Sequence, residues 1–337
     1  MNRKKLFSLG KLYVSDFIKE GNEPRGPKSP LTLVMEKETK AVRLSEIPSS
    51  DTMYGQYWYR SGINATMTKE LGDIVKSCTE CVKINKGDVW LDIACNDGTL
   101  LKQVPKDMIK IGVDPADDTY ANESMQVSDL IIQKFFNKDS YFKSKFGHKK
   151  AKIITTIAMF YDLDDPISFL KDVYSIMEDD GLFILQMSYT PLMLKQLALD
   201  NICHEHIYYY NLTNIKYILE NVGFNVVDCQ LNDVNGGSFR IYVRKFTASI
   251  LDFKTSPYRD VANYRINSIL EKEKADKMDT PEPYMEFWKR INLLKDETVA
   301  FIKNAKSEGK TIWGYGASTK GNTLLQWFNL DETLIDG

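Results

Sequence analysis

The 337-residue chain has no long apolar run, no excess of either charge, and few cysteines and histidines. No stretch approaches the about 20 apolar residues that cross a bilayer, so no membrane-spanning helix is expected. Lysine and arginine (44) nearly balance aspartate and glutamate (46), which argues against a basic nucleic-acid-binding surface. The five cysteines, an odd number, argue against a disulfide framework and for a reducing compartment. We therefore predict a cytoplasmic protein that binds neither nucleic acid nor membrane.

The first part of the chain is rich in turn-forming residues and poor in periodicity. Glycine and proline recur in it, and only short strand-like runs such as Leu31–Val34 are present. The basic start is followed by the apolar stretch Leu6–Val14, but Gly10 and Lys11 interrupt it, so no export signal is expected. We predict an irregular N-terminal arm over residues 1–65.

Residues 66–246 alternate strand-like apolar runs with helical patterns. Strands are predicted over 88–94, 109–113, 153–158 and 182–187, and helices over 66–84 and 166–178. This alternation requires crossover connections and predicts an α/β domain with a doubly wound, mostly parallel sheet. After a helix over 212–221, the runs 225–228 and 238–244 are close enough to form an antiparallel pair.

Residues 247–337 form the third predicted segment. It is charged and helical up to about residue 307, and Thr311–Trp313 is predicted to be a strand that enters the glycine loop 314–321 and a final helix. Backbone N–H groups at such a loop can bind phosphate, although a packed turn without a ligand is an equal alternative. The candidate ligands are Ser318, Lys320 and Gly321.

The loop after strand 88–94 contains one glycine, whereas a pyrophosphate-binding loop would need three. A dinucleotide is therefore not expected there. The second strand ends at Asp114, where a carboxylate can accept the hydroxyls of a ribose. Several carboxylates around one loop suit the cationic S-adenosylmethionine, while a plain helix cap at Asp97 and Gly98 is the alternative. The candidate cofactor-binding residues are Asp92, Cys95, Asn96, Asp97, Gly98, Asp114 and Pro115.

Two of the three histidines lie in the triplet His204-Glu205-His206. Histidine titrates near neutrality and a neighbouring carboxylate raises its basicity, so the triplet suits general acid–base work. A metal site is a weaker alternative, because no third ligand is evident, and we predict no metal. A pair of structural histidines is the other alternative.

An aromatic and basic segment precedes the first predicted helix. It contains Tyr54, Tyr57, Trp58, Tyr59 and Arg60. Aromatic faces and hydroxyls suit a sugar pocket, and a tyrosine hydroxyl can stabilise an enolate. Packing of an N-terminal arm over the sheet is the alternative.

The segment Leu91–Leu101 resembles the first motif of class I S-adenosylmethionine methyltransferases, and more narrowly that of the nucleotide-sugar C-methyltransferases. Tyr57–Asn64, His204–His206 and Gly314–Leu325 are similar to further segments of the same family. The resemblance implies a class I methyltransferase sheet with an antiparallel last strand and a partial C-terminal Rossmann-like domain. It also implies methyl transfer from S-adenosylmethionine to a carbon of a nucleotide-linked keto-deoxysugar.

The resemblance assigns acid–base roles to Glu205 and His206. The further catalytic candidates are His204, Tyr57 and Tyr59. The substrate-binding candidates outside the second glycine loop are Arg60, Asn64, Gly236 and Gly237.

The chain departs from this family at its start, its triplet and its end. Relatives begin with a zinc module of two Cys-x-x-Cys pairs, but here Glu36 and Thr39 stand in place of the second pair, so no zinc is predicted. Cys203 replaces a tyrosine that precedes the triplet in the sugar-acting branch, which implies a different substrate or handling of it. Relatives continue through further strands, so the C-terminal domain is expected to be incomplete. Two alternatives stay open: an O- or N-methyltransferase on a small molecule, and a non-catalytic relative that binds S-adenosylmethionine.

Overall fold

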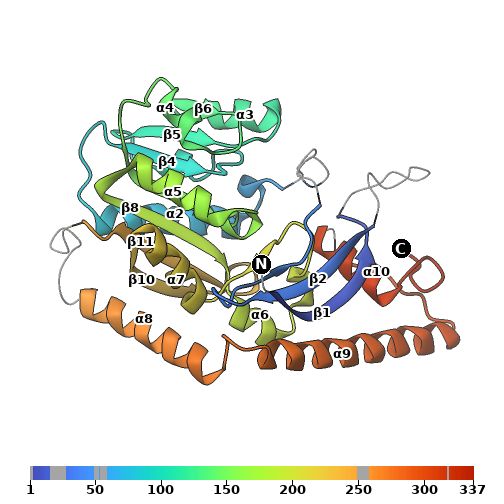
Figure 1. Cartoon of the computed structure of the whole chain (residues 1–337). Helices are drawn as coiled ribbons and strands as arrows, with labels where there is room; N and C mark the ends of the chain where they lie inside the picture. Colours follow the sequence, from blue (N-terminus) through green and yellow to red (C-terminus); the bar gives the residue numbers. More distant parts are fainter. Residues whose placement is uncertain (1–2, 16–27, 49–52, 54–58, 249–257, 317–318) are drawn as a thin grey trace. The chain divides into compact units, whose positions relative to one another are not determined.

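The computed structural model describes residues 3–15, 28–48, 53, 59–248, 258–316 and 319–337 (Figure 1). The chain divides into two compact units. The first unit comprises the described residues of 1–55, 189–211 and 273–337, and the second unit comprises those of 56–188 and 212–272. This division by contacts does not coincide with the predicted segments, whose boundaries stay a prediction.

The second unit is built on a seven-stranded sheet in the order β10-β11-β8-β7-β4-β5-β6. Its strands are β4 (Val89–Ile93), β5 (Ile109–Val113), β6 (Leu130–Ile132), β7 (Ala151–Ile157), β8 (Met177–Ser188), β10 (Phe224–Asn232) and β11 (Ser238–Lys245). The strands from β6 to β8 are parallel, and β11 runs antiparallel to both β8 and β10. The predicted doubly wound sheet and its antiparallel pair are confirmed.

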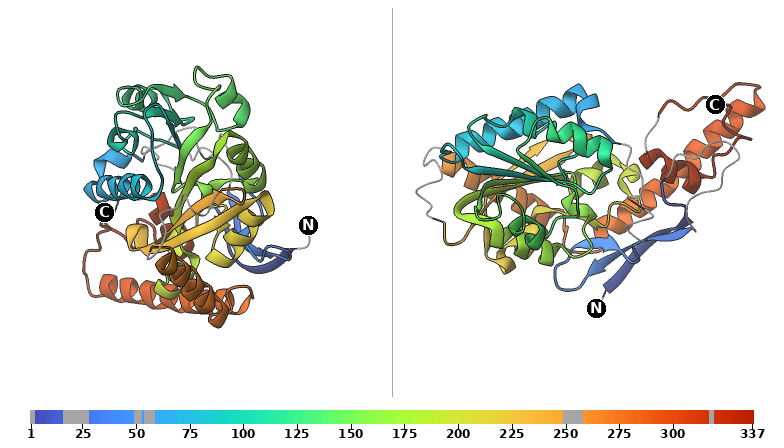
Figure 2. Two further views of the ribbon diagram at one scale, coloured as in Figure 1. Left: turned by 90° about the vertical axis from the view of Figure 1, so that its left-hand side faces the viewer. Right: turned by 90° about the horizontal axis from the view of Figure 1, so that it is seen from above.

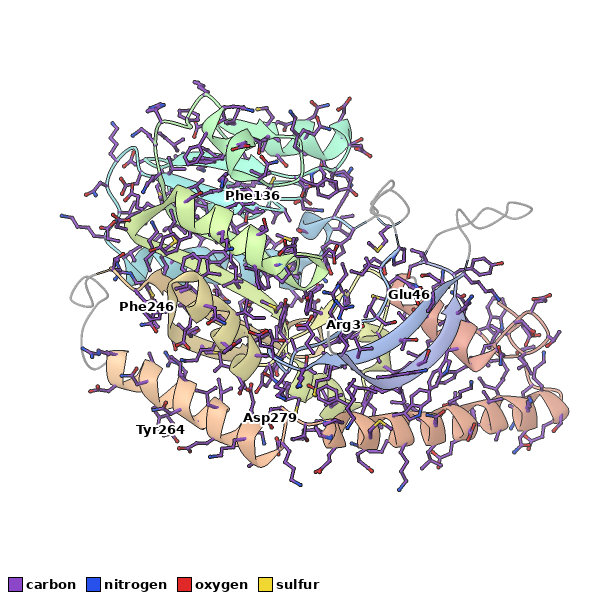
Figure 3. The ribbon with its side chains drawn as sticks, in the orientation of Figure 1. Arg3, Glu46, Phe136, Phe246, Tyr264 and Asp279 are labelled. Carbon is purple, nitrogen blue, oxygen red and sulfur yellow. The ribbon has the colours of Figure 1, made fainter. Side chains whose placement is uncertain are left out.

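Helices cover both faces of this sheet (Figure 2). On one face lies α2 (Ala65–Cys81). Its residues Leu71, Ile74 and Cys78 recur at helical spacing and are buried in one cluster with Trp90 of β4. On the other face lie α5 (Pro166–Ile176) and α7 (Leu212–Val222), and Tyr174 of α5 packs edge-on against a phenylalanine of β10. The short helices α3 (Asp118–Met125) and α4 (Lys138–Phe142) complete the crossovers, and Phe136 packs against α5 (Figure 3). The predicted helices over 66–84, 166–178 and 212–221 are confirmed.

Between β4 and β5, where every residue is described, no α-helix forms, so the alternative of a plain helix cap at Asp97 and Gly98 is wrong. Only the 3-10 turn η2 (Leu101–Gln103) follows β4. Pro105 comes two residues later and cannot continue a helix interior, and β5 already begins at Ile109. The connection therefore contains no α-helix, and hydrogen bonds to other parts of the chain hold the loop after β4.

The prediction of an irregular N-terminal arm is also wrong. A four-stranded antiparallel sheet in the first unit has the order β1-β2-β3-β9. Its strands are β1 (Arg3–Leu12), β2 (Ser29–Glu36), β3 (Val42–Leu44) and β9 (Tyr208–Tyr209). Gly10, which looked like a break in an apolar run, lies at a register shift between β1 and β2 and has φ +92°. Glycine tolerates that conformation, so the strand continues through it.

The first unit also contains the helices α6 (Thr190–Gln196), α9 (Glu282–Ser307) and α10 (Thr319–Phe328), whereas most of α8 (Tyr258–Ala275) belongs to the second unit. The core of the first unit joins β1 to α9, where Phe7 stacks on Trp288 with ring centroids 4.9 Å apart. The predicted final helix is confirmed, but the strand at 311–313 is wrong. There the Ile312 amide donates to the Asp336 carboxylate and the Ile312 carbonyl accepts from the Asp336 amide, so this backbone pairs with the end of the chain, which is not a strand.

Within the described ranges, no helix combines the length and the apolar character that a membrane span requires. The same residues contain no group of three or more His, Cys, Asp or Glu side chains placed to hold a metal ion. The five cysteines are buried thiols.

Candidate active site

The loop after β4 has an unusual backbone. Ala94, Asn96 and Gly98 have φ values of +63°, +52° and +77°. Left-handed backbone costs a non-glycine residue on the order of 1 kcal/mol or more, so the surrounding contacts must hold the loop in place. Glycine is required at position 98, because a Cβ there would lie 2.9 Å from the Ser124 backbone.

Asp114 fastens this loop to the end of β5. Its carboxylate accepts hydrogen bonds from the Asn96 amide at 2.8 Å and the Ala116 amide at 2.8 Å. Burial raises the pKa of Asp114, while these two amide donors oppose the rise. Each carboxylate oxygen has a second lone pair, so Asp114 can still accept a hydroxyl from a ligand.

Asn96 and Asp97, two predicted cofactor ligands, bind another part of the protein. The Asn96 side chain accepts from the Ser61 amide and donates to the Tyr59 carbonyl. The Asp97 carboxylate accepts from the Gly62 amide at 2.8 Å. These side chains therefore connect the loop after β4 to residues 59–62, the described end of the aromatic segment.

Asp92 is a buried carboxyl group at the end of β4, only 3% exposed. One of its oxygens accepts from the Thr155 hydroxyl at 2.7 Å, and no described residue donates a hydrogen bond to the other oxygen. Burial raises the pKa of Asp92 to about 7; the Thr155 hydrogen bond opposes this rise and the Asp114 carboxylate adds to it. A buried acid with an unused oxygen suits a cationic ligand, which would favour the carboxylate form.

The raised pKa of Asp92 predicts a pH-dependent stability. In the folded state this group holds a proton that the unfolded chain releases near pH 4, so its stabilising contribution is present below pH 4 and is lost between about pH 4 and 7. Asp92→Asn stays neutral and should gain a few kcal/mol, as an order of magnitude, relative to wild type over that range. Urea unfolding of both proteins at several pH values checks this. A difference that is constant with pH would contradict it.

The remaining predicted cofactor residues, Cys95 and Pro115, differ in their exposure to solvent. Cys95 is 4% exposed and packs in the core under Gly112, whose added Cβ would lie 2.6 Å from its sulfur. Its thiol therefore faces the protein interior, and burial raises its pKa. Pro115 is exposed directly after Asp114.

The histidine triplet lies in the first unit, between η4 (Leu199–Asn201) and β9. His206 is 8% exposed, and its Nδ1 lies 2.8 Å from the Asn201 carbonyl oxygen. A carbonyl only accepts, so Nδ1 carries the proton of the neutral ring and Nε2 is its basic nitrogen. The Leu44 amide donates to the Ile207 carbonyl, so β3 fixes the chain next to this histidine.

His204 has a different environment from His206. It is 1% exposed, and its Nε2 donates to the Ser29 carbonyl at the start of β2. Burial lowers the pKa of His204, so its neutral form is favoured. These contacts match a histidine that fixes the segment to the N-terminal sheet. Glu205, between the two, is partly buried.

The predicted substrate residues are scattered. Arg60 pairs with Glu123 and lies over the Tyr120 ring, 4.3 Å from its centroid. Asn64 caps α2 by accepting from the Thr66 amide. Gly321 lies in α10 of the first unit. Tyr57 and Ser318 lie outside the described residues, as does the side chain of Lys320.

Gly236 and Gly237 lie between β10 and β11. Their φ values are +81° and +116°, a backbone that glycine adopts without strain. Ser238, the next residue, pairs with Ser188 at the carboxyl end of β8. The hairpin therefore belongs to the edge of the sheet at which parallel-sheet proteins bind ligands.

One polar group at this edge was missed from the sequence. It contains Glu70, Gln186, Asn232 and Arg240, which are joined by hydrogen bonds. The available signal was Gln186 itself, a single amide within the otherwise apolar strand Leu182–Met187. A polar side chain in a strand buried on both faces needs partners, and such partners can only come from other elements.

Two family models and one known protein match this chain. Residues 63–228 match a family model described as a methyltransferase domain, and residues 233–337 match the C-methyltransferase C-terminal domain. The C-methyltransferase NovU of Streptomyces niveus is 25% identical over 299 residues, which make up 88% of this chain and 68% of that protein.

Two solved structures are similar to about half of this chain. An S-adenosylmethionine-dependent methyltransferase from Clostridium acetobutylicum ATCC 824 is 16% identical with a TM-score of 0.40, over 53% of this chain and 92% of that chain. Magnesium protoporphyrin IX methyltransferase from Synechocystis PCC 6803, with bound SAH, is 14% identical with a TM-score of 0.42, over 57% of this chain and 91% of that chain.

The predicted family, enzyme class and methyl donor are thus confirmed by two adjoining family matches and by the strand order of the sheet. The chain belongs to the class I S-adenosylmethionine-dependent methyltransferases, and within them to those with a C-methyltransferase C-terminal domain.

Proposed function

We propose that this enzyme methylates a carbon of a nucleotide-linked keto-deoxysugar and does so in the cytoplasm. The observation that carries the proposal is the tautomer of His206, in which the Asn201 carbonyl engages Nδ1 and makes Nε2 the basic nitrogen. A carbon acceptor needs a base, because the carbon beside a ketone must lose a proton to become nucleophilic. The match to the C-methyltransferase C-terminal domain supports the same reaction class.

The residues at the carboxyl ends of β4 and β5 fit S-adenosylmethionine. Asp92 offers an unused oxygen to a cationic centre, and Asp114 lies where open parallel sheets bind a ribose. When bound, this cofactor supplies an electrophilic methyl group. Asn96 and Asp97 act indirectly in this proposal, by holding the loop against residues 59–62.

The role proposed for Asp114 predicts a loss of cofactor affinity in Asp114→Ala. The variant lacks the acceptor for the ribose and also the anchor of the Asn96 amide, so the dissociation constant of S-adenosylmethionine should rise about 10- to 100-fold. Calorimetry measures it. Asp129→Ala is the matched control, since Asp129 accepts a backbone amide from the opposite end of β5. Equal affinities of wild type and Asp114→Ala would refute the assignment.

The acid–base steps are assigned to residues of the chain. His206 takes the proton from carbon at Nε2, and the neighbouring Glu205 carboxylate favours the resulting imidazolium. Burial, together with the nearby Asp97 carboxylate, raises the pKa of Tyr59. The Tyr59 phenol therefore keeps its proton and can donate a hydrogen bond to an enolate oxygen.

The reaction is tested with a panel of keto-deoxysugars linked to thymidine, uridine or guanosine diphosphate. The methyl donor carries ¹³C in its methyl group, and NMR of the product locates the label. A labelled methyl bonded to carbon supports the proposal, whereas one on oxygen or nitrogen would move the enzyme to another class of methyltransferase. Absence of turnover with every sugar, in protein that binds the donor, would reject the proposed substrate class.

A further inference from the structure

The polar group at the end of β8 contains an amide that is buried but only half used. Gln186 is 2% exposed. Its side-chain oxygen accepts from Arg240 Nε at 2.8 Å and from Asn232 Nδ2 at 3.2 Å. No described residue accepts a hydrogen bond from its Nε2. Nε2 is not among the enclosed side-chain atoms that lack a partner, so this N–H is open to solvent although the residue as a whole is buried. An oxygen of a ligand can therefore reach it.

The orientation of this amide is fixed by its partners. Arginine has no acceptor atom, so the atom of Gln186 that faces Arg240 must be the oxygen. Arg240 is the residue opposite Gln186 on β11. The Nε2 group is therefore the atom of the amide that remains for a further partner. On β7 the residue opposite Gln186 is Ile157, and residues 157–159 are only partly buried.

The rest of the group holds the amide rigidly. Arg240 also pairs with Glu70 at 2.6 Å, and the two side chains are 8% and 12% exposed. Asn232 donates to Glu70 as well as to Gln186. The positive charge of Arg240 acts on the amide oxygen and polarises it, which makes the opposite N–H a stronger donor.

The position of Gln186 separates it from the cofactor loop. Gln186 lies at the carboxyl end of β8, and β7 lies between this strand and β4, from which the cofactor loop starts. The glycine hairpin 236–237 ends beside the same strand end. A ligand at β8 is thus displaced by two strands from the cofactor carboxylates, on the side of the glycine hairpin.

We propose that the Gln186 amide donates a hydrogen bond to an oxygen of the methyl acceptor and so orients it. The proposal deepens the proposed function and rests on it, because a keto sugar presents the carbonyl and hydroxyl oxygens that such a donor requires. Glu70, Asn232 and Arg240 are positioning residues that act through Gln186.

Gln186→Glu is the sharpest test of this role. A glutamate keeps an oxygen for Arg240 and Asn232 but replaces the N–H donor with a second acceptor. With whichever nucleotide-linked keto-deoxysugar of the panel is turned over, kcat/KM should fall about 10- to 100-fold. The affinity for S-adenosylmethionine should stay within twofold and the melting temperature within a few degrees. Gln186→Met, which has no donor or acceptor, should show at least the same loss of kcat/KM.

Gln230→Leu is the matched control, since Gln230 lies opposite Arg240 on β10 and its side chain donates to Asp228. It should retain the kcat/KM of wild type. A Gln186→Glu enzyme within threefold of wild type overturns the inference and leaves the proposed function standing. A parallel loss of cofactor affinity and melting temperature also overturns it, since the role would then be structural. A wild-type enzyme that turns over no sugar of the panel rejects the proposed function itself, and the inference with it.

Discussion

Replacing His206 with asparagine is expected to lower kcat by about 10²- to 10⁴-fold, with S-adenosylmethionine bound as tightly as in wild type. The amide N–H₂ of asparagine can take the place of Nδ1 and still donate to the Asn201 carbonyl. The variant therefore keeps the contact that fixes this segment and removes only the basic Nε2. Measured kcat with a turned-over keto sugar, and calorimetry with the cofactor, check the two halves of the prediction.

The control for this variant is His148→Asn, because His148 is an exposed histidine of the second unit. It should leave kcat unchanged. A second measurement follows exchange of the sugar's carbon-bound hydrogen with deuterium from solvent while the cofactor product, which has no methyl to transfer, is bound. Exchange catalysed by wild type and lost in His206→Asn would locate the defect at proton removal. An asparagine variant with at least a third of the wild-type kcat would eliminate His206 as the base.

The strands of the large sheet could be predicted because each carries its own signal. β4, β5, β7 and β8 are short apolar runs between polar turns. Their order in the sheet was not predicted: β7 pairs with β4 and not with β6, the strand that precedes it in the sequence. The helix α2 was recognisable for a similar reason, since its apolar residues recur at helical spacing. Such local patterns survive in the fold when burial on one or both faces decides the conformation.

The N-terminal sheet could not be predicted, since its stability depends on residues far away in sequence. β3 has only three residues and pairs with β9, whose Tyr208 lies opposite Arg43. The Tyr208 hydroxyl also accepts from the Arg43 guanidinium at 2.6 Å. A strand this short has no periodicity of its own, and its partner is the segment that carries His206. The N-terminal sheet therefore holds the histidine triplet in place.

The candidate site likewise contains residues that could be predicted from the sequence and residues whose contacts could not. Asp92 and Asp114 could be found from the sequence because each ends a recognisable strand at the edge where parallel sheets bind ligands. The hydrogen bonds that Asn96 and Asp97 form within the chain could not be predicted, because their donors are the backbone amides of residues 61 and 62. Backbone donors have no sequence signature, so the sequence cannot separate a side chain that binds a ligand from one that binds the chain.

Replacing Arg240 with methionine is expected to lower the free energy of unfolding by about 3–5 kcal/mol. The change leaves the Glu70 carboxylate, which is 12% exposed, without its partner at 2.6 Å. It also removes the donor to the Gln186 oxygen. Methionine has a similar length and no charge, so the loss reports the uncompensated buried groups more than a cavity. Urea unfolding followed by fluorescence measures the change.

A double-mutant cycle separates the charge from the packing. Arg240→Met combined with Glu70→Leu leaves no buried charge, so the double variant should be more stable than Arg240→Met alone, although Glu70→Leu adds a second change. Lys216→Met is the matched control: Lys216 pairs with Glu220 on α7, where the two side chains are 29% and 35% exposed, and should cost less than about 1 kcal/mol. If Arg240→Met costs no more than Lys216→Met, the Arg240–Glu70 pair is solvated in solution. The rigid support that it gives Gln186 would then be absent, and the Gln186→Glu result would have to be explained without it.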